Sequence, residues 1–305
     1  MIARSGQEDN SMTKQMIGVI GVGMMGHGIA RNIRRKGWPL AYLDHPGNQP
    51  SDDLDADGAQ RFDDASALAA ASDVLILCVT GSPQIEALLL GPDSVTASLR
   101  PGTIVVDCST GIPSATMKAA EAVKAADCDF VDAAMTRTPK EAEEGRLNLL
   151  IGGDPATVER LTTLFEAFSE NRFHAGGIGR GQTLKLLHNF VSLGSVTLIA
   201  EAAACAAEND IAPEVLVDCL RRGGGYGAAL DRTAPYILEG DVTPMRFSNA
   251  NARKDLTYYS QLVEETGTSR KVAEGVRAAL DWLVESGHGD EMMPTACTTF
   301  RKTER

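Results

Sequence analysis

The sequence lacks the features that would point to an oxidising compartment or to a nucleic-acid partner. Its six cysteines lie far apart and form no Cys-x-x-Cys pair, so we predict reduced thiols that serve as packing residues. Basic residues are also few, because 29 Lys and Arg stand against 41 Asp and Glu, which gives a formal net charge of −12. Phosphate backbones bind to basic surfaces, so this balance excludes a nucleic-acid partner. A cytoplasmic protein with a local site for any anionic ligand is predicted.

Export and membrane signals are missing as well. Residues 1–9 contain no apolar stretch of signal-peptide length, so we interpret residues 1–14 as a disordered leader that includes Met12 as a candidate start. The longest apolar stretch, residues 183–208, suggests a buried helix of a soluble protein rather than a membrane span, and its apolar surface predicts a homodimer or homotetramer. Four polar residues interrupt this stretch: Lys185, His188, Asn189 and Glu201.

The chain does contain enough apolar material for two domains, with 305 residues of which 43% are hydrophobic. From residue 16 to about residue 174, short β-branched runs alternate with helical stretches, which is typical of a parallel sheet flanked by helices. Strands are expected at residues 17–21, 40–43, 74–79, 104–107, 130–133, 147–151 and 172–174. Helices are expected to begin near Met24, Ser66, Pro83, Pro113 and Pro155.

The pattern changes after residue 174, and from residue 181 onward the spacing is helical. We therefore predict an α/β fold in which a doubly wound sheet occupies residues 15–177. An all-α domain at residues 178–305 would then contribute to substrate binding and dimerisation.

The segment 21–26, Gly-Val-Gly-Met-Met-Gly, follows the first expected strand and opens a helix, as a dinucleotide-binding (Rossmann-type) fingerprint requires. Its glycines permit a tight turn and let backbone N–H groups approach a pyrophosphate at the helix N-terminus. Asp44 ends the second strand, where a carboxylate accepts hydrogen bonds from ribose hydroxyls and repels a 2′-phosphate, so NAD is predicted rather than NADP. A glycine turn without a cofactor is the alternative. The predicted cofactor contacts here are Gly21, Gly23, Met24, Met25, Gly26 and Asp44.

A second motif, at the expected junction between the domains, places three glycines (176, 179 and 181) before Lys185 and Asn189. Lys185 and Asn189 are four residues apart, so on a helix they share one face near its N-terminal end. A lysine here could protonate an alkoxide as hydride reaches a carbonyl, and burial would lower its pKa so that it could also act as a base. The alternative is an exposed lysine beside a packing amide. The histidines show no metal-ligand spacing, so no metal is predicted.

Taken in order, these motifs resemble the β-hydroxyacid dehydrogenase family. This family includes 3-hydroxyisobutyrate dehydrogenase and tartronate semialdehyde reductase, and it is related to 6-phosphogluconate dehydrogenase. The resemblance runs from about residue 16 to the C-terminus. It rests on segments 21–26, 107–110 with Pro113, 132–133 and 145–153, on the helix of Lys185, and on segment 254–256.

The resemblance implies an NAD-dependent oxidoreductase that interconverts a small 3-hydroxy acid and its semialdehyde by hydride transfer. It implies Lys185 as general acid and base with Asn189 beside it. Two classes stand as alternatives: an imine reductase, which typically lacks the lysine, and a non-catalytic nucleotide-binding module. The family also implies cofactor contacts from Cys78, Val79, Ser109 and Lys254, and substrate contacts from Ser109 and Thr110.

One loop departs from the family. Where the common pattern reads Asp-Ala-Pro-Val-Ser-Gly-Gly, residues 132–138 read Asp-Ala-Ala-Met-Thr-Arg-Thr, so Arg137 replaces a glycine. Its planar fork of donors matches an oxyanion, and Thr136 and Thr138 add hydroxyl donors, so all three are predicted to bind the substrate. The Arg-Thr pair is similar to the sulfolactaldehyde reductase branch, where this loop serves a sulfonate. The alternative is that Arg137 pairs with Glu141 or Glu143.

Overall fold

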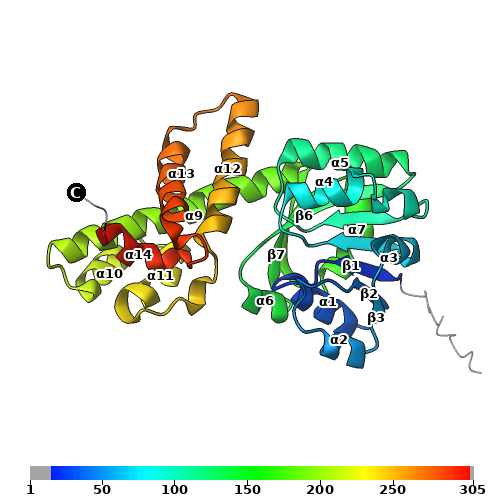
Figure 1. The fold of residues 1–305 in the computed structure, drawn as a ribbon, viewed down its shortest axis with the longest axis horizontal. Coiled ribbons are helices and arrows are strands. Elements are labelled where there is room, and N and C mark those ends of the chain that lie inside the picture. The colour runs from blue at the N-terminus through cyan, green and yellow to red at the C-terminus, as the bar shows by residue number, and fades with distance from the viewer. Residues whose placement is uncertain (1–14, 303–305) are drawn as a thin grey trace, which may run out of the picture.

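One eight-stranded sheet forms the core of the N-terminal half of the computed structural model, which describes residues 15–302 (Figure 1). The predicted leader lies outside the described residues. The strand order is β3-β2-β1-β4-β5-β6-β7-β8. Successive strands are added on one side of β1 up to β3 and on its other side from β4 onward, and open α/β sheets bind ligands at this switch between β1 and β4. The strands are β1 (Ile17–Ile20), β2 (Leu40–Leu43), β3 (Gln60–Phe62), β4 (Val74–Leu77), β5 (Ile104–Asp107), β6 (Asp129–Thr136), β7 (Leu147–Gly152) and β8 (Ser169–Gly176).

Two features of the sheet differ from the sequence prediction. Strands β6 and β7 pair antiparallel, whereas a parallel sheet was expected. Their connection, residues 137–146, is shorter than the roughly dozen residues that a parallel crossover needs, so only an antiparallel return is possible. Strand β3 was not predicted, because it is a three-residue edge strand whose side chains are mostly exposed and show no apolar alternation.

Helices cover both faces of the sheet, so the predicted doubly wound α/β architecture is confirmed (Figure 1). Proline lies in the first turn of α4, α5 and α7, where its missing N–H leaves no hydrogen bond unmade. One buried apolar cluster includes Ile33, Tyr42 and Phe168, and a second cluster includes Leu77 and Leu89. The helices are α1 (Gly26–Arg35), α2 (Asp52–Ala56), α3 (Ala65–Ala71), α4 (Ser82–Leu90), α5 (Pro113–Ala125), α6 (Pro139–Glu143), α7 (Pro155–Arg160) and α8 (Thr162–Phe165).

The C-terminal half is helical, as predicted, and is organised around α9, which runs from the sheet into the helical lobe (Figure 1). By length and composition α9 could cross a membrane, but 50% of its most apolar window is buried inside the protein. It packs against α11, α12 and α14, as a core helix does. The helices are α9 (Arg180–Glu208), α10 (Pro213–Arg222), α11 (Ala228–Glu239), α12 (Asn249–Thr266), α13 (Lys271–Leu283) and α14 (Ala296–Thr299).

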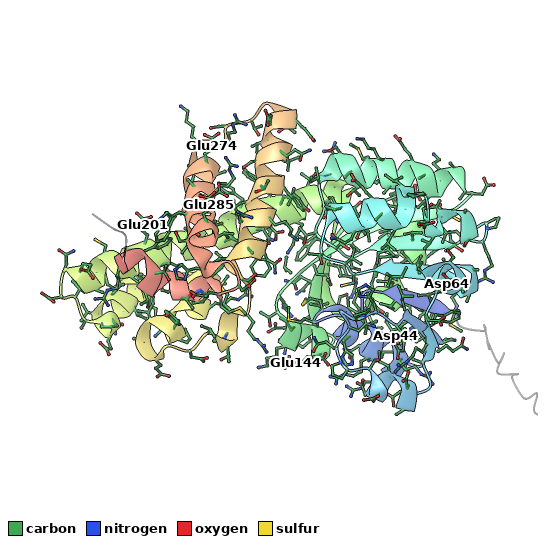
Figure 2. All side chains as sticks on the ribbon, in the orientation of Figure 1. Asp44, Asp64, Glu144, Glu201, Glu274 and Glu285 are labelled. Carbon is green, nitrogen blue, oxygen red and sulfur yellow. The ribbon has the colours of Figure 1, made fainter. Side chains whose placement is uncertain are left out.

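Acidic side chains are spread over both lobes. Figure 2 shows Asp44, Asp64 and Glu144 on the sheet lobe and Glu201, Glu274 and Glu285 on the helical lobe. The six cysteines are free thiols, but Cys205 and Cys219 are exposed, so the prediction that the cysteines are packing residues is wrong for these two.

Candidate active site between the sheet and the helical lobe

The turn after β1 has the geometry that a dinucleotide requires. Gly21 has a φ of +98°, and a Cβ there would lie 2.2 Å from the carbonyl oxygen of Cys78. A Cβ at Gly26 would lie 2.0 Å from the oxygen of Gly21, so both positions need glycine. In the part of the chain that the structure describes, the backbone N–H groups of Met24 and Met25 donate no hydrogen bond. The turn therefore presents free donors at the N-terminus of α1, which suits a pyrophosphate.

Asp44 has a neighbour that the sequence did not reveal. Its Oδ2 lies 3.5 Å from Nη1 of Arg61, which belongs to the unpredicted strand β3. Arg61 also donates a 2.5 Å hydrogen bond to Asp55 and lies 5.8 Å from the ring centroid of Tyr42. The prediction of NAD was made from the carboxylate of Asp44 and took no account of an arginine from another strand. The fold brings an arginine there from the next strand, although two carboxylates already hold it.

The ends of β4 and β5 are joined by Ser109. Its Oγ accepts a 3.0 Å hydrogen bond from the N–H of Val79, and its own N–H donates to Asp107 at 2.9 Å. Cys78, Val79, Ser109 and Thr110 thus lie together at the carboxyl edge of the sheet, beside the glycine turn. Burial and the nearby Asp107 raise the pKa of the Cys78 thiol to about 12, so this thiol stays neutral.

The start of α9 is fixed to this edge through Asp132, at the centre of β6. Its carboxylate accepts hydrogen bonds from the N–H groups of Gly179, at 2.7 Å, and Gln182, at 2.8 Å. Burial raises the pKa of Asp132 to about 7, although these two N–H donors oppose the shift. The fully buried Gln182 side chain also accepts from Gly111 at 2.8 Å and donates to the carbonyl of Ser109 at 2.9 Å. Gln182 was not among the predicted site residues, although a lone amide in an apolar run indicates a buried hydrogen-bond partner.

Lys185 lies inside the protein, on the face of α9 that meets α12. It is 9% exposed, so the alternative of an exposed surface lysine is wrong. Burial lowers its pKa to about 8, while the carboxylate of Asp255 acts in the opposite direction and Lys254 lowers the pKa further. On the next turn, Asn189 donates a 2.6 Å hydrogen bond to Oδ2 of Asp255. Lys185, Asn189 and Asp255 therefore form one buried polar group.

Lys254 connects the two lobes. Its ammonium donates a 2.5 Å hydrogen bond to the carbonyl of Thr80, just after β4, and lies 3.3 Å from Oδ1 of Asp255. Its side chain is 25% exposed, which does not fit an ordinary surface lysine. This contact places the group of Lys185 next to the edge that carries Val79 and Ser109.

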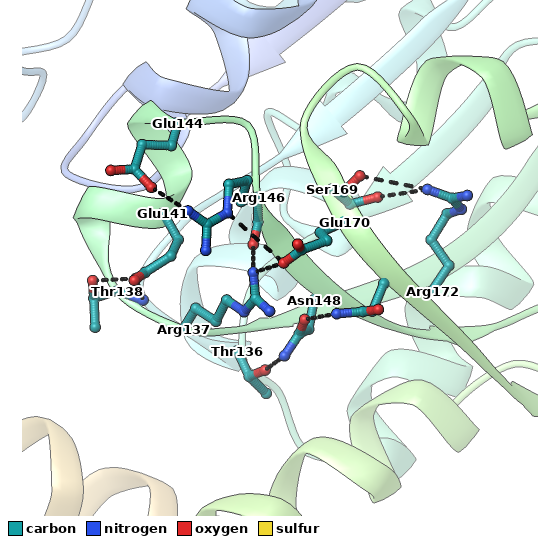
Figure 3. Close-up of polar contacts among 11 residues, drawn as sticks. Thr136, Arg137, Thr138, Glu141, Glu144, Arg146, Asn148, Ser169, Glu170 and Arg172 are labelled. Atoms are coloured by element: carbon teal, nitrogen blue, oxygen red, sulfur yellow. Dashed lines mark hydrogen bonds and ion pairs between the residues drawn. The ribbon is translucent and has the colours of Figure 1, made fainter. Parts of the chain in front are cut away.

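The loop after β6 explains why a glycine is common at position 137 (Figure 3). Arg137 has a φ of +83°, in the left-handed region that favours glycine. Its guanidinium donates to the carbonyl of Arg146 at 2.5 Å and forms an ion pair with Glu170 of β8. The alternative prediction, that Arg137 pairs with Glu141 or Glu143, is wrong. Strand β8, from a distant part of the chain, approaches this loop and supplies Glu170 instead.

Those two glutamates have other partners. Glu141 accepts hydrogen bonds from the N–H and hydroxyl groups of Thr138 and so caps α6, while Glu143 pairs with His27 and Arg31 of α1. Thr136 accepts a 3.0 Å hydrogen bond from Asn148. The three side chains predicted to bind an anion, those of residues 136–138, are thus all engaged within the protein.

The described residues were also compared with the requirements of a metal site. Within residues 15–302, no group of three or more His, Cys, Asp and Glu side chains is arranged to hold a metal ion.

Comparisons with known proteins cover both lobes. The NAD-binding domain of 6-phosphogluconate dehydrogenase matches residues 16–177, and the NAD-binding domain of NADP-dependent 3-hydroxyisobutyrate dehydrogenase matches residues 179–297. The NAD-dependent L-serine dehydrogenase of Pseudomonas aeruginosa is 31% identical over 85% of this chain and 86% of its own. The 2-hydroxy-3-oxopropionate reductase of Escherichia coli is 30% identical over 79% of this chain and 81% of its own.

A solved structure shows the same fold. The 3-hydroxyisobutyrate dehydrogenase of Mycobacterium tuberculosis with L-serine superposes with a TM-score of 0.84 at 23% identity, over 94% of this chain and 99% of the other.

Proposed function

The chain belongs to the β-hydroxyacid dehydrogenase family of NAD(P)-dependent oxidoreductases, and we propose that it interconverts a small 3-hydroxy acid and its semialdehyde, with Lys185 as general acid and base. The observation that carries the proposal is the environment of Lys185. This lysine is buried with a pKa of about 8, beside Asn189 and Asp255, and next to the edge of the sheet that carries the glycine turn. Substrates of the 3-hydroxyisobutyrate, tartronate semialdehyde and sulfolactaldehyde types fit this chemistry.

The bound nicotinamide dinucleotide supplies or accepts the hydride, and the residues of this chain handle the proton. Lys185 donates a proton to the substrate carbonyl oxygen during reduction and takes it back from the hydroxyl during oxidation. A pKa of about 8 leaves both forms of the lysine populated near neutral pH. Lys254, bound to the carbonyl of Thr80, closes one side of the site and so excludes water. Ser109 and Thr110 line the same edge and would contact both ligands.

Reduction of a panel of aldehydes tests the proposal. NADH oxidation is measured with the semialdehydes of methylmalonate, tartronate and succinate and with sulfolactaldehyde. We expect at least one substrate with a kcat/KM of about 10⁴ M⁻¹s⁻¹ or more. Turnover of cyclic imines instead would favour an imine reductase. Binding of NADH without turnover of either class would favour the non-catalytic module.

NAD is the proposed cofactor, because the carboxylate of Asp44 lies at the end of β2, where it would meet the adenosine ribose. Arg61 is shared between Asp44 and Asp55 and so is not free to receive a phosphate. A kcat/KM that is higher for NADPH than for NADH would contradict this choice.

A homodimer in the cytoplasm is proposed for the assembled protein. Leu187, Val191 and Leu198 of α9 are 45%, 65% and 61% exposed, and a groove of about 750 Å³ lies between this helix and the start of α11. Apolar residues exposed along one helix favour a second copy as the partner, since a closed dimer buries the same surface twice. Sedimentation that shows a monomer at micromolar concentration would contradict the dimer.

Replacing Asp255 with asparagine should move the pH profile of the enzyme to lower pH. The substitution keeps an oxygen that can accept from Asn189 but removes the charge that raises the pKa of Lys185. Reduction needs the protonated amine, so it should slow several-fold at pH 8, while oxidation should persist to lower pH. The profile of kcat/KM measures this shift. Glu264→Gln, on the exposed side of the same helix, serves as the control, and an unmoved profile in Asp255→Asn would contradict the role of the carboxylate.

A further inference from the structure

The side chain of Gln182 binds the first turn of α9 to the segment that follows β5. Its Oε1 accepts a 2.8 Å hydrogen bond from the N–H of Gly111, and its Nε2 donates at 2.9 Å to the carbonyl of Ser109. Nε2 also lies 3.5 Å from Oδ2 of Asp107. The residue is fully buried, so both ends of the amide depend on these protein partners rather than on water or a ligand.

The backbone of Gln182 is fixed by β6. Its N–H donates a 2.8 Å hydrogen bond to Oδ2 of Asp132, and the N–H of Gly179 donates to Oδ1 of the same carboxylate at 2.7 Å. Lys185 lies three residues after Gln182, so the two residues share one face of α9. The amide therefore relates segment 109–111 to a helix start whose own position is set by Asp132.

Other backbone contacts of this segment come from the sheet lobe. Two of its N–H groups are held by side chains of that lobe, Ser109 by Asp107 at 2.9 Å and Ile112 by Ser82 at 2.8 Å. The N–H between them, that of Gly111, is held by Gln182 from the helix that contains Lys185. Loss of the amide would leave the segment bound to the sheet lobe, but it would release the fixed distance between the segment and the catalytic helix.

The two segments that Gln182 joins contain the groups for both halves of the proposed reaction. Ser109 and Thr110 form the edge at which the nicotinamide would deliver its hydride, and Lys185 holds the proton for the oxygen of the same carbonyl group. The carbon that receives the hydride and the oxygen that receives the proton are bonded to each other, so the two donors need a fixed separation. A misplacement of about 1 Å can lower the rate by about 10²-fold.

We infer that Gln182 is a positioning residue, which sets the separation between the nicotinamide edge at Ser109 and Thr110 and the ammonium of Lys185. The inference rests on the proposed function. Gln182 touches neither ligand, so its loss should slow the chemical step and leave binding intact. Hydride transfer should then limit turnover, which a deuterium isotope effect reports.

Replacing Gln182 with methionine, which has a similar length but no amide, tests the inference. On the best semialdehyde, kcat should fall about 10²-fold, while the KM of the aldehyde and the Kd of NADH stay within about twofold of the wild-type values. With NADH that contains deuterium at both positions of nicotinamide C4, the isotope effect on kcat should rise above that of the wild type.

Gln182→Glu provides a rescue that depends on pH. A neutral glutamic acid can still accept from Gly111 and donate through its O–H to Ser109, which reproduces the amide. Once ionised, it has no donor and lies beside the carboxylate of Asp107. The other charged residues in or against this turn are Asp132, Arg180 and Lys185. The ratio of kcat for Gln182→Glu to that of the wild type should therefore be high at about pH 6 and fall toward the methionine level at about pH 9.

Ser72→Ala serves as the control for loss of a buried hydrogen bond. Ser72 is fully buried and donates at 2.7 Å to the carbonyl of Leu68, just before β4 and so at the amino edge of the sheet. Its replacement should lower the urea-unfolding midpoint and leave kcat and the isotope effect as in the wild type.

The inference is overturned if Gln182→Met keeps the wild-type kcat, or if kcat and the unfolding midpoint fall together while the isotope effect is unchanged. If Gln182→Met does not fold, a ratio for Gln182→Glu that is the same at both pH values overturns it. A wild-type protein that reduces no semialdehyde would overturn the proposed function, whereas an active wild type with unaffected Gln182 variants would overturn this inference alone.

Discussion

Replacing Lys185 with methionine should lower kcat/KM by about 10³, within the range that a positioned general acid contributes. Methionine is close to lysine in volume and suits a side chain that is 9% exposed, so the helix should keep its place. The affinity for NADH should change little, because we propose that the glycine turn and Asp44, rather than Lys185, bind the dinucleotide. Steady-state reduction of the best semialdehyde and fluorescence titration of NADH give the two values.

The pH dependence separates a proton donor from a packing residue. In the wild type, reduction should fall as pH rises through about 8, because Lys185 loses its proton there, and oxidation should rise over the same range. The residual activity of Lys185→Met should show neither the fall in reduction nor the rise in oxidation near pH 8. Lys271→Met, at an exposed position that opens α13, provides the control. A Lys185→Met variant with more than a tenth of the wild-type activity would assign the proton to another group.

Local sequence patterns were sufficient to predict most of the fold. The β-branched runs of β1, β4 and β5 are buried on both faces, so their apolar character was continuous and their places were plain. Strand β3 was not predicted, because its position at the edge of the sheet leaves its residues mostly exposed and polar. The antiparallel direction of β7 was not predicted, because strand direction depends on the length of the connection, which the apolar pattern does not encode.

The candidate site divides in the same way. Lys185 and Asn189 could be found because helical spacing places both on one face of α9. The partners of the site came from elsewhere in the chain: Arg61 reaches Asp44 from β3, and Glu170 reaches Arg137 from β8. Contacts between segments distant in sequence depend on how the elements pack, so a single sequence does not reveal them. The ion pair of Arg137 with Glu170 depends on the packing of β8 against the loop, so it could not be predicted from the sequence.

Replacing Gly181 with alanine should destabilise the protein by about 3 kcal/mol, the upper part of the range for overpacking. A Cβ at this position would lie 2.4 Å from the carbonyl oxygen of Leu150 and 2.7 Å from Oδ2 of Asp132. The first contact is with strand backbone, which cannot move aside without disturbing the sheet. The start of α9 would have to withdraw, which would stretch the hydrogen bonds from Gly179 and Gln182 to Asp132. Urea unfolding followed by circular dichroism measures the loss.

The same displacement should also reduce activity, because Lys185 lies one turn further along α9. Gly275→Ala is the matched control: this glycine is inside α13, and a Cβ there would meet no heavy atom within 4 Å. It should stabilise the protein by roughly 0.5–1 kcal/mol, since alanine is the better helix former. Equal urea-unfolding midpoints for Gly181→Ala and the wild type would mean that α9 can shift on the sheet without loss of stability. The bonds of Asp132 would then not fix the position of Lys185, and α9 would have to be held by its packing against α11, α12 and α14.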